Sequence, residues 1–269
     1  VEASHARTGP DWSSLCSNWM TQWERFGDEA YRDKILVGSE DIKNAPLKLV
    51  SGPDFEFNDS PDPVVSAAMI EKIYLQEKEK YGIDNVVLLS PFRQKTETGV
   101  NALNQRIQTR INPPAPEKEQ AVFRNRIFRV GDKVMQTKNC EDVNNGDVGY
   151  ITTILGSGSD AVVRVDFDDG RTAEYEGSDL EMLDLAYACT VHKSQGDEFK
   201  SVIINLQCAH SVMLVRPLIY TAITRAKERV IIVGERKALC IAIRRTDTEQ
   251  RGTKLALRIQ EIMRSRREN

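Results

Sequence analysis

Residues 188–199 read ACTVHKSQGDEF and lie between two apolar runs, LDLAYA before them and SVIINL after them. The apolar runs predict neighbouring strands of a buried sheet. The segment between them carries hydroxyl, imidazole, amide, ammonium and carboxylate groups within nine residues. A plain connection between strands needs no such set of donors, acceptors and charges. A single histidine here would more simply belong to the core, but the whole cluster favours a ligand-binding loop.

The sequence around this loop alternates between apolar runs and helical patterns. SPDPVVSAAMIEKIYLQEKEKYG predicts a helix that Asp62 caps and Pro63 begins, with Val65, Met69 and Ile73 facing the core. Further strands are expected at NVVLLSP and RVIIVGE, and further helices at GVNALNQRIQTRI, VRPLIYTAITRAKE and RKALCIAIRR. Strands that are apolar throughout are typical of a parallel sheet covered by helices on both faces.

The pattern differs between residues 122 and 183. Short alternating segments (FRVGDKVMQT, DVGYITTI, AVVRVDFDD and RTAEYEG) are separated by glycine, asparagine and aspartate turns, among them NNGD. This pattern predicts a small antiparallel β-barrel inserted in the α/β domain. We therefore expect an N-terminal helical or irregular segment at 1–45, an α/β domain formed by 46–121 and 184–269, and the inserted barrel at 122–183.

Composition limits the classes of function. The 269 residues carry a formal net charge of −3, so any nucleic-acid contact must come from a local basic patch. No apolar run is long enough to cross a bilayer, and no secretory signal pattern is present, so we expect a cytoplasmic protein. Without a C-x-x-C pair, the scattered cysteines predict neither a metal site nor disulfides: Cys16, Cys140, Cys189, Cys208 and Cys240.

Two other segments carry chemistry. In LIYTAITRAKERVIIVGE, Tyr220, Thr224 and Lys227 are expected along one side of a helix, with Arg225 beside them. An arginine there can stabilise charge on a transferring phosphoryl group, although a solvated basic face is an equal alternative. In LLSPFRQKTETGVNALNQRIQ, polar residues around Arg93 could contact a phosphate backbone, although an ordinary surface turn is simpler.

Taken together, these segments resemble the RecD-like branch of superfamily 1 DNA helicases over roughly residues 50–265. TVHKSQGDEF is similar to the motif V of that family, YTAITRAK to its motif VI, and LLSPFRQKTETGVNALN to the region of its motif IV. The resemblance implies the second RecA-like domain of such a helicase, with an SH3-like barrel inserted before motif V. It also implies movement along single-stranded DNA from 5′ to 3′.

The resemblance further implies roles for individual residues. Arg225 would be the catalytic arginine finger that reaches the γ-phosphate of ATP. Three residues would line the nucleotide side of the cleft between domains: Gln195, Gly196 and Glu198. Four would lie nearer the DNA: Thr190 and His192, and with weaker support Ser90 and Arg93.

One departure from the family pattern is large. The chain contains no G-x-x-x-x-G-K-[ST] sequence, which holds ATP and its Mg²⁺ in this family. The first RecA-like domain is therefore expected to be missing, and the chain alone should not hydrolyse ATP or hold a metal ion. The expected partners are that domain, single-stranded DNA and other subunits of a nuclease–helicase complex. Two alternatives remain: a non-catalytic DNA-binding or adaptor module on the same fold, and the helicase part of a conjugative relaxase.

Overall fold

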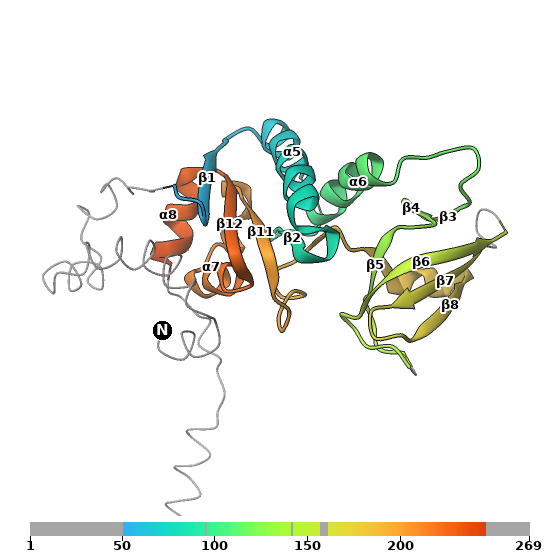
Figure 1. The fold of residues 1–269 in the computed structure, drawn as a ribbon. Coiled ribbons are helices and arrows are strands. Elements are labelled where there is room, and N and C mark those ends of the chain that lie inside the picture. Colours follow the sequence, from blue (N-terminus) through green and yellow to red (C-terminus); the bar gives the residue numbers. More distant parts are fainter. Residues whose placement is uncertain (1–50, 95, 141, 157–160, 246–269) are drawn as a thin grey trace, which may run out of the picture.

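A computed structural model describes residues 51–245, apart from 95, 141 and 157–160, and shows two bodies side by side (Figure 1). One is built on a parallel sheet with helices, and the other on antiparallel strands. The helical or irregular segment expected at 1–45 lies outside the described residues, as do residues 246–269 of the expected α/β domain. Among the described residues, no helix has the length and apolar character needed to cross a membrane.

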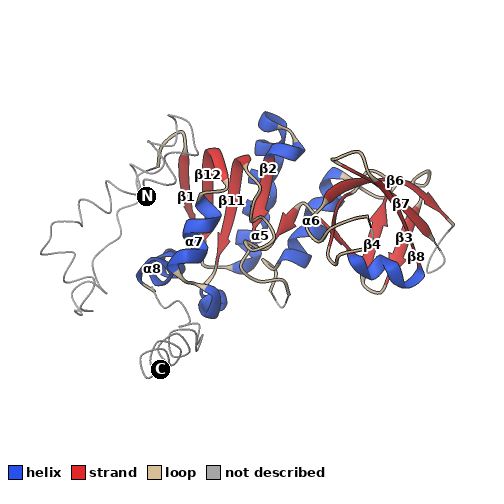
Figure 2. Ribbon diagram, turned by 90° about the horizontal axis from the view of Figure 1, so that it is seen from below, coloured by secondary structure: helices blue, strands red, loops and turns tan. Residues whose placement is uncertain are grey.

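The parallel sheet has five strands in the order β1-β12-β11-β2-β10, and every pairing in it is parallel. Figure 2 shows β1 at the edge far from the second body and β2 nearer to it. The α/β class predicted from the alternating pattern is therefore confirmed. The strands are β1 (Phe55–Asp59), β2 (Val86–Leu89), β10 (Ala188–Cys189), β11 (Phe199–Leu206) and β12 (Ala226–Gly234).

Helices cover both faces of this sheet. Alternate residues of β11 point to opposite faces, so Ile203 packs in the core with α5 and α6, whereas Val202 and Ile204 pack with α7 and α8. Burial on both faces explains the continuous apolar runs of β2 and β11, whereas the edge strand β1 (FEFND) alternates. The helices are α5 (Pro63–Tyr81), α6 (Val100–Ile111), α7 (Arg216–Ile223) and α8 (Arg236–Arg244), and short 3₁₀ helices are η1 (Ile83–Asn85), η2 (Gly177–Met182) and η3 (Cys208–Met213).

Helix α5 begins as predicted but turns a different face to the core. The Asp62 carboxylate accepts hydrogen bonds from the backbone N–H groups of Val64 at 2.7 Å and Val65 at 3.1 Å. Val65 itself is 53% exposed, so its expected place in the core is wrong. The buried face instead contains two small residues, which let the helix approach the sheet, and one paired carboxylate: Ser66, Ala67, Ile70, Tyr74 and Glu77.

The second body is a five-stranded antiparallel sheet in the order β8-β7-β6-β5-β9, accompanied by a β3–β4 hairpin. Its sharp turns lie at glycines with positive φ, including Gly146 in the predicted NNGD turn. The strands are β3 (Gln120–Phe123), β4 (Arg126–Arg129), β5 (Lys133–Gln136), β6 (Val148–Leu155), β7 (Val162–Phe167), β8 (Thr172–Glu176) and β9 (Leu183–Leu185).

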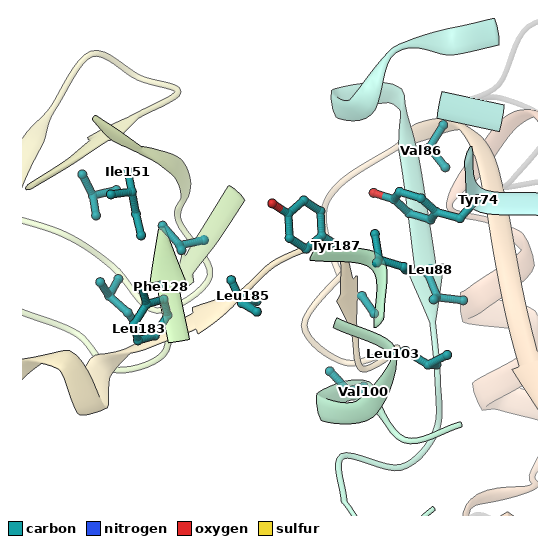
Figure 3. Close-up of a cluster of buried hydrophobic side chains, with 14 of the residues drawn as sticks. Tyr74, Val86, Leu88, Val100, Leu103, Phe128, Ile151, Leu183, Leu185 and Tyr187 are labelled. Carbon is teal, nitrogen blue, oxygen red and sulfur yellow. The ribbon is translucent and has the colours of Figure 1, made fainter. Parts of the chain in front are cut away.

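A continuous core joins the two bodies. Tyr187, which is fully buried, lies between the barrel residue Leu185 and the side chains of Tyr74 and Leu88 from the α/β body (Figure 3). The Tyr187 hydroxyl donates to the buried Asp132 carboxylate at 3.0 Å. Asp132 also accepts from three groups on both sides of the junction: Gln108 Nε2, Asn112 Nδ2 and the Arg129 N–H. Because these partners come from α6 and from the barrel, they fix the barrel against the sheet.

Candidate functional site

The polar loop between Cys189 and Phe199 runs from one edge of the parallel sheet to the other. Thr190 directly follows β10 at the carboxyl edge, and Glu198 directly precedes β11 at the amino edge. Since β2 lies between β10 and β11, the loop must pass across the sheet to join them. The residues at its two ends therefore lie at opposite edges of the sheet.

Arg225 lies in a tight turn rather than in a helix. Helix α7 ends at Ile223 and β12 begins at Ala226, so the predicted helix to residue 228 is too long. The backbone N–H of Phe199 donates to the carbonyl oxygen of Arg225 at 2.8 Å, and Phe199 pairs with Ala226 in the sheet. Strand pairing thus overrides helix propensity here and moves Lys227 onto the strand.

The turn brings Arg225 against the end of the loop. Its Nη1 donates to the Asp197 carbonyl oxygen at 3.1 Å, and its Nε donates to the Thr221 carbonyl oxygen at 3.3 Å. Next to this contact, Lys227 of β12 forms an ion pair with Glu198 of the loop, with Lys227 Nζ 3.1 Å from Glu198 Oε2. The structure therefore brings Arg225 together with Glu198 and, through Asp197, with Gly196. Gln195 is exposed on the same loop.

A pocket of about 580 Å³ lies between this amino edge and the barrel. Two lysines line it, Lys133 and Lys227, together with six carboxylates: Asp84, Asp147, Asp168, Asp169, Asp197 and Glu198. Burial raises the pKa of both Asp168 and Asp197. This excess of acids disfavours a triphosphate in the pocket, so an anion approaching Arg225 has to come from outside it.

Ser90 lies at the carboxyl edge and is fully buried. Its hydroxyl donates to the Thr98 carbonyl oxygen at 2.9 Å and accepts from Asn205 Nδ2 at 3.2 Å. The expected contact of Ser90 with DNA is therefore corrected: its polar group is used inside the protein. Ser90 positions the loop after β2, on which Arg93 lies.

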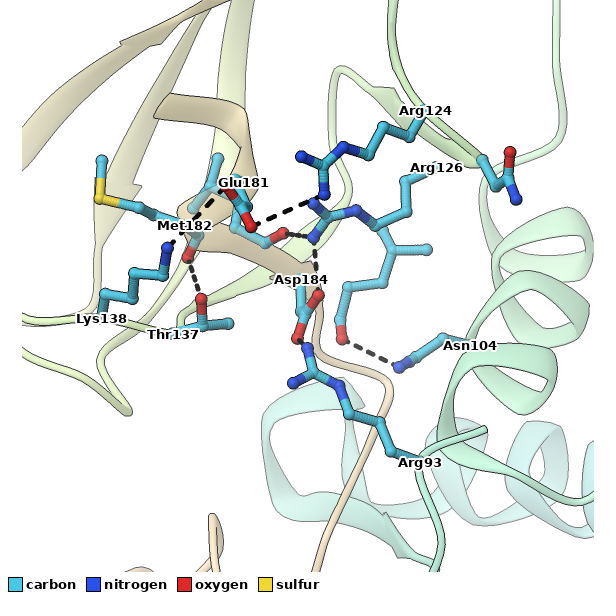
Figure 4. A network of polar contacts seen from close by, with 12 residues as sticks. Arg93, Asn104, Arg124, Arg126, Thr137, Lys138, Glu181, Met182 and Asp184 are labelled. Atoms are coloured by element: carbon cyan, nitrogen blue, oxygen red, sulfur yellow. Dashed lines mark hydrogen bonds and ion pairs between the residues drawn. The ribbon is translucent and has the colours of Figure 1, made fainter. Parts of the chain in front are cut away.

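Arg93 is half-exposed and is bound to the carboxylate of Asp184, which was not among the site residues predicted from the sequence. Arg93 Nη2 bonds to Asp184 Oδ2, and Arg126 Nη1 lies 2.7 Å from Asp184 Oδ1 (Figure 4). Lys193 Nζ, from the polar loop, lies 3.9 Å from the same carboxylate. Burial and the neighbouring Arg93 lower the pKa of Lys193, whereas Asp184 raises it. Sequence alone had no signal for this cluster, because Arg93 and Asp184 are 91 residues apart.

Thr190 and His192 complete the residues expected near DNA. Thr190 is partly buried and His192 is exposed, and both lie at the beginning of the polar loop. Among the residues that the structure describes, no group of three or more His, Cys, Asp or Glu side chains could hold a metal ion.

Two segments of this architecture match known protein families. Residues 103–167 match the SH3 domain of ATP-dependent RecD-like DNA helicases, and residues 185–233 match the C-terminal domain of UvrD-like helicases. The chain carries a RecD-like helicase region. The second segment contains Thr190, His192, Arg225 and the three residues expected at the nucleotide, whereas Ser90 and Arg93 precede both segments of this RecD-like region.

Two RecD proteins are similar to this chain. The chain is 38% identical to the ATP-dependent RecD2 DNA helicase of Deinococcus radiodurans over 190 residues, which is 70% of this chain and 25% of that protein. It is 35% identical to the RecBCD enzyme subunit RecD of Mycolicibacterium smegmatis over 131 residues, 48% of this chain and 22% of that subunit. The chain thus spans about a quarter of the length of these relatives. Bacteroides Pif1 bound to single-stranded DNA aligns with a TM-score of 0.40 and 19% identity, covering 73% of this chain and 54% of that one.

The first 77 residues of the chain resemble a different protein family. Residues 1–77 match the C-terminal α/α toroid domain of PcRGLX-like proteins. A stretch of 63 residues, 23% of this chain, is 49% identical to the uncharacterized protein YetA of Bacillus subtilis, of which it covers 7%. This second likeness is not among the predictions from the sequence. Neither of the two segments that match helicase families includes residues 1–77.

Proposed function

We propose that the RecD-like region acts as the second half of an ATP-dependent DNA helicase motor that moves 5′ to 3′ along single-stranded DNA. The first half, a P-loop domain, would bind ATP and Mg²⁺. The observation that carries this proposal is the contact of Arg225 with the loop that contains Gly196 and Glu198. We assign 46–121 and 184–269 to the RecA-like domain and 122–183 to the SH3-like barrel, whose strands β3 and β9 each extend two residues beyond these bounds.

Arg225 is suited to a catalytic role by the partners that it has. Both of its side-chain hydrogen bonds go to backbone carbonyl oxygens, and no carboxylate forms an ion pair with it among the described residues. Two carbonyl bonds orient the planar guanidinium but do not neutralise it. Its charge is therefore free to stabilise a γ-phosphate held by an opposing domain, with Gln195, Gly196 and Glu198 lining the cleft beside it.

The two ends of the polar loop suggest how hydrolysis and DNA movement are linked. Glu198 and Arg225 lie at the amino edge of the sheet, and Thr190, His192 and Arg93 lie toward the carboxyl edge. A shift of the loop when two domains close on ATP would displace the DNA-facing end as well. The same loop would thereby couple the two ligands, in a cytoplasmic enzyme that other subunits of a nuclease–helicase complex could join.

The test uses a protein that contains this chain together with a P-loop domain. Arg225→Ala should lower ATP turnover by roughly 10³-fold or more, because the developing charge on the phosphoryl group loses its partner. The Kd for single-stranded DNA should stay within about twofold, since Arg225 lies at the other edge from Arg93. Lys200→Gln, which removes an exposed lysine paired with Glu228, is the matched control and should leave turnover unchanged. Retained turnover in Arg225→Ala overturns the assignment.

The chain alone gives a second test. We expect it to bind single-stranded oligonucleotides weakly and to hydrolyse no ATP, with or without DNA. The logarithm of the binding constant should fall with the logarithm of the salt concentration with a slope of about −0.7 for each neutralised phosphate. A slope of zero argues against a backbone track, and DNA-stimulated hydrolysis by the pure chain contradicts the need for a second domain.

A further inference from the structure

One carboxylate at the junction of the two bodies holds three cations from three separate segments. Asp184 lies in β9, Arg93 in the loop after β2, Arg126 in the β3–β4 hairpin and Lys193 in the polar loop. Each Asp184 oxygen faces one arginine, and Lys193 approaches the oxygen that Arg93 uses. Several cations converge on one anion here, as they do where proteins hold a phosphate group, and each arginine contacts the carboxylate through one nitrogen.

The surroundings of Asp184 have more positive than negative charge. Among the described residues, one other carboxylate belongs to this network: Glu181, which lies 3.6 Å from Arg124 and 3.9 Å from Lys138 (Figure 4). Two carboxylates thus face five cations, which leaves three positive charges unmatched. Burial is the main cause of the lowered pKa of Lys193; Asp184 acts in the opposite direction, and the neighbouring Arg93 contributes to the lowering. Such a cluster attracts a further anion more strongly than a cation.

The three contacts of Asp184 differ in how easily they can be exchanged. Arg126 is only 24% exposed and also donates to the Leu183 carbonyl oxygen, so it is held in the barrel by a second bond. Arg93 is 49% exposed. Lys193 is only 25% exposed, but its Nζ lies 3.9 Å from the carboxylate, beyond hydrogen-bond distance, and within the described part of the chain it has no second bond of the kind that holds Arg126. Arg93 and Lys193 can therefore move to another anion, whereas Arg126 stays in place.

We propose that the Asp184 carboxylate occupies the place of a backbone phosphate of single-stranded DNA, and that a bound strand takes Arg93 and Lys193 from it. Asp184 is then an internal competitor that keeps both cations positioned when DNA is absent. The exchange also removes the ionic links from Asp184 to the loop after β2 and to the polar loop, while the buried contacts of Tyr187 and Asp132 continue to hold the barrel against the sheet. This inference rests on the proposed function, because it requires that the region binds DNA.

The experiment measures binding of a fluorescent oligo-dT to the whole chain by anisotropy. Asp184→Asn keeps the shape of the side chain and removes its charge, so binding should tighten by roughly three- to tenfold at low salt, the size expected for one or two exposed ion pairs. The gain should shrink at high salt, because surface charges are screened. An abasic strand should show the same gain, since phosphate contacts carry no base information.

Two further variants make the outcome decisive. Glu228→Gln removes another carboxylate that is ion-paired with a lysine and changes the net charge equally, and it should leave the Kd within about twofold. Arg93→Gln should weaken binding, and in the double variant Asp184→Asn should give a smaller gain, since one of the released cations is gone. If Asp184→Asn binds no more tightly than Glu228→Gln, or binds more weakly, the competitor role is wrong. If the unaltered chain does not bind DNA at all, the proposed function itself fails.

Discussion

The guanidinium of Arg225 and the backbone carbonyl of Asp197 are joined by a hydrogen bond of 3.1 Å, across a sequence separation of 28 residues. This bond ties the turn before β12 to the end of the polar loop. It exists because Phe199 and Ala226 are paired in neighbouring parallel strands, which places both preceding turns at the same edge of the sheet. Two sequence segments with separate motifs thereby form one site.

Arg225→Lys should loosen the end of the polar loop without unfolding the chain. A lysine has no planar fork, so it cannot bond the Thr221 and Asp197 carbonyl oxygens together. We expect the Asp197 amide, which is bonded to the Ser194 carbonyl at 3.3 Å, to exchange its hydrogen several-fold faster by mass spectrometry or NMR. The free energy of unfolding should change by less than about 1 kcal/mol, because the site is at the surface. Lys200→Gln, which removes a lysine paired with Glu228 outside the polar loop, is the control. Equal exchange in Arg225→Lys and unaltered protein would contradict the role of the bond.

Two glycines with positive φ should respond differently to alanine. Gly196 has a φ of +109° and open space around it, so Gly196→Ala carries only backbone strain, about 1–3 kcal/mol. Gly234 has a φ of +146°, and a Cβ there would lie 1.8 Å from the Leu206 carbonyl oxygen in the paired strand. Gly234→Ala must push β11 and β12 apart, so we expect a loss above about 3 kcal/mol or no soluble folded chain. Urea denaturation compares the two, and equal losses would show that the close approach at Gly234 is not tight.

The N-cap of α5 can be tested by removing the side-chain oxygen of Asp62. Asp62→Ala leaves the Val64 and Val65 N–H groups without their acceptor and should cost about 1 kcal/mol in the free energy of unfolding. Asp62→Asn retains an oxygen at the same position and should lose only a few tenths. Chemical denaturation of the three proteins measures the difference. An alanine variant as stable as the asparagine variant would mean that water satisfies the helix end equally well.

His210 should make the chain sensitive to acid. It is fully buried against Phe92, with ring centroids 5.3 Å apart, and burial lowers its pKa to about 4, although Glu235 acts in the opposite direction. Between that value and the ordinary pKa of about 6.5, the unfolded chain binds more protons than the folded one, so stability rises with pH in this window. The stabilising effect is complete above about pH 6.5 and is lost as the pH falls toward 4.

The measurement is the midpoint of urea unfolding between pH 4 and 7. His210→Asn keeps an acceptor near the position of Nδ1, which receives the Gln207 N–H at 3.4 Å, and removes the titration. We expect this variant to be less stable at pH 7 and to have a flatter dependence on pH. If both proteins lose stability equally between pH 6.5 and 4, other groups account for the acid sensitivity.

Much of the architecture was predictable because its signals are local. The apolar run of β11, the Asp62–Pro63 helix start and the glycine turns of the barrel each depend on a few adjacent residues. Errors occurred where packing overrode the local pattern: Val65 is exposed because the small residues Ser66 and Ala67 face the sheet instead. Similarly, Arg225 lies outside the predicted helix because the chain pairs with β11 from Ala226 onward.

The candidate site likewise has features that the sequence predicts and features that only the fold determines. Its residue types and order determined the likeness to RecD-like helicases, since Gln195, Gly196, Glu198 and Arg225 lie in short motifs that can be read along the chain. Which of them meet was decided only by the fold. The order of strands carries the polar loop from one edge of the sheet to the other, and it brings Asp184 to Arg93 over 91 residues. Contacts between distant segments depend on how the strands pair, and no local pattern of side chains encodes them.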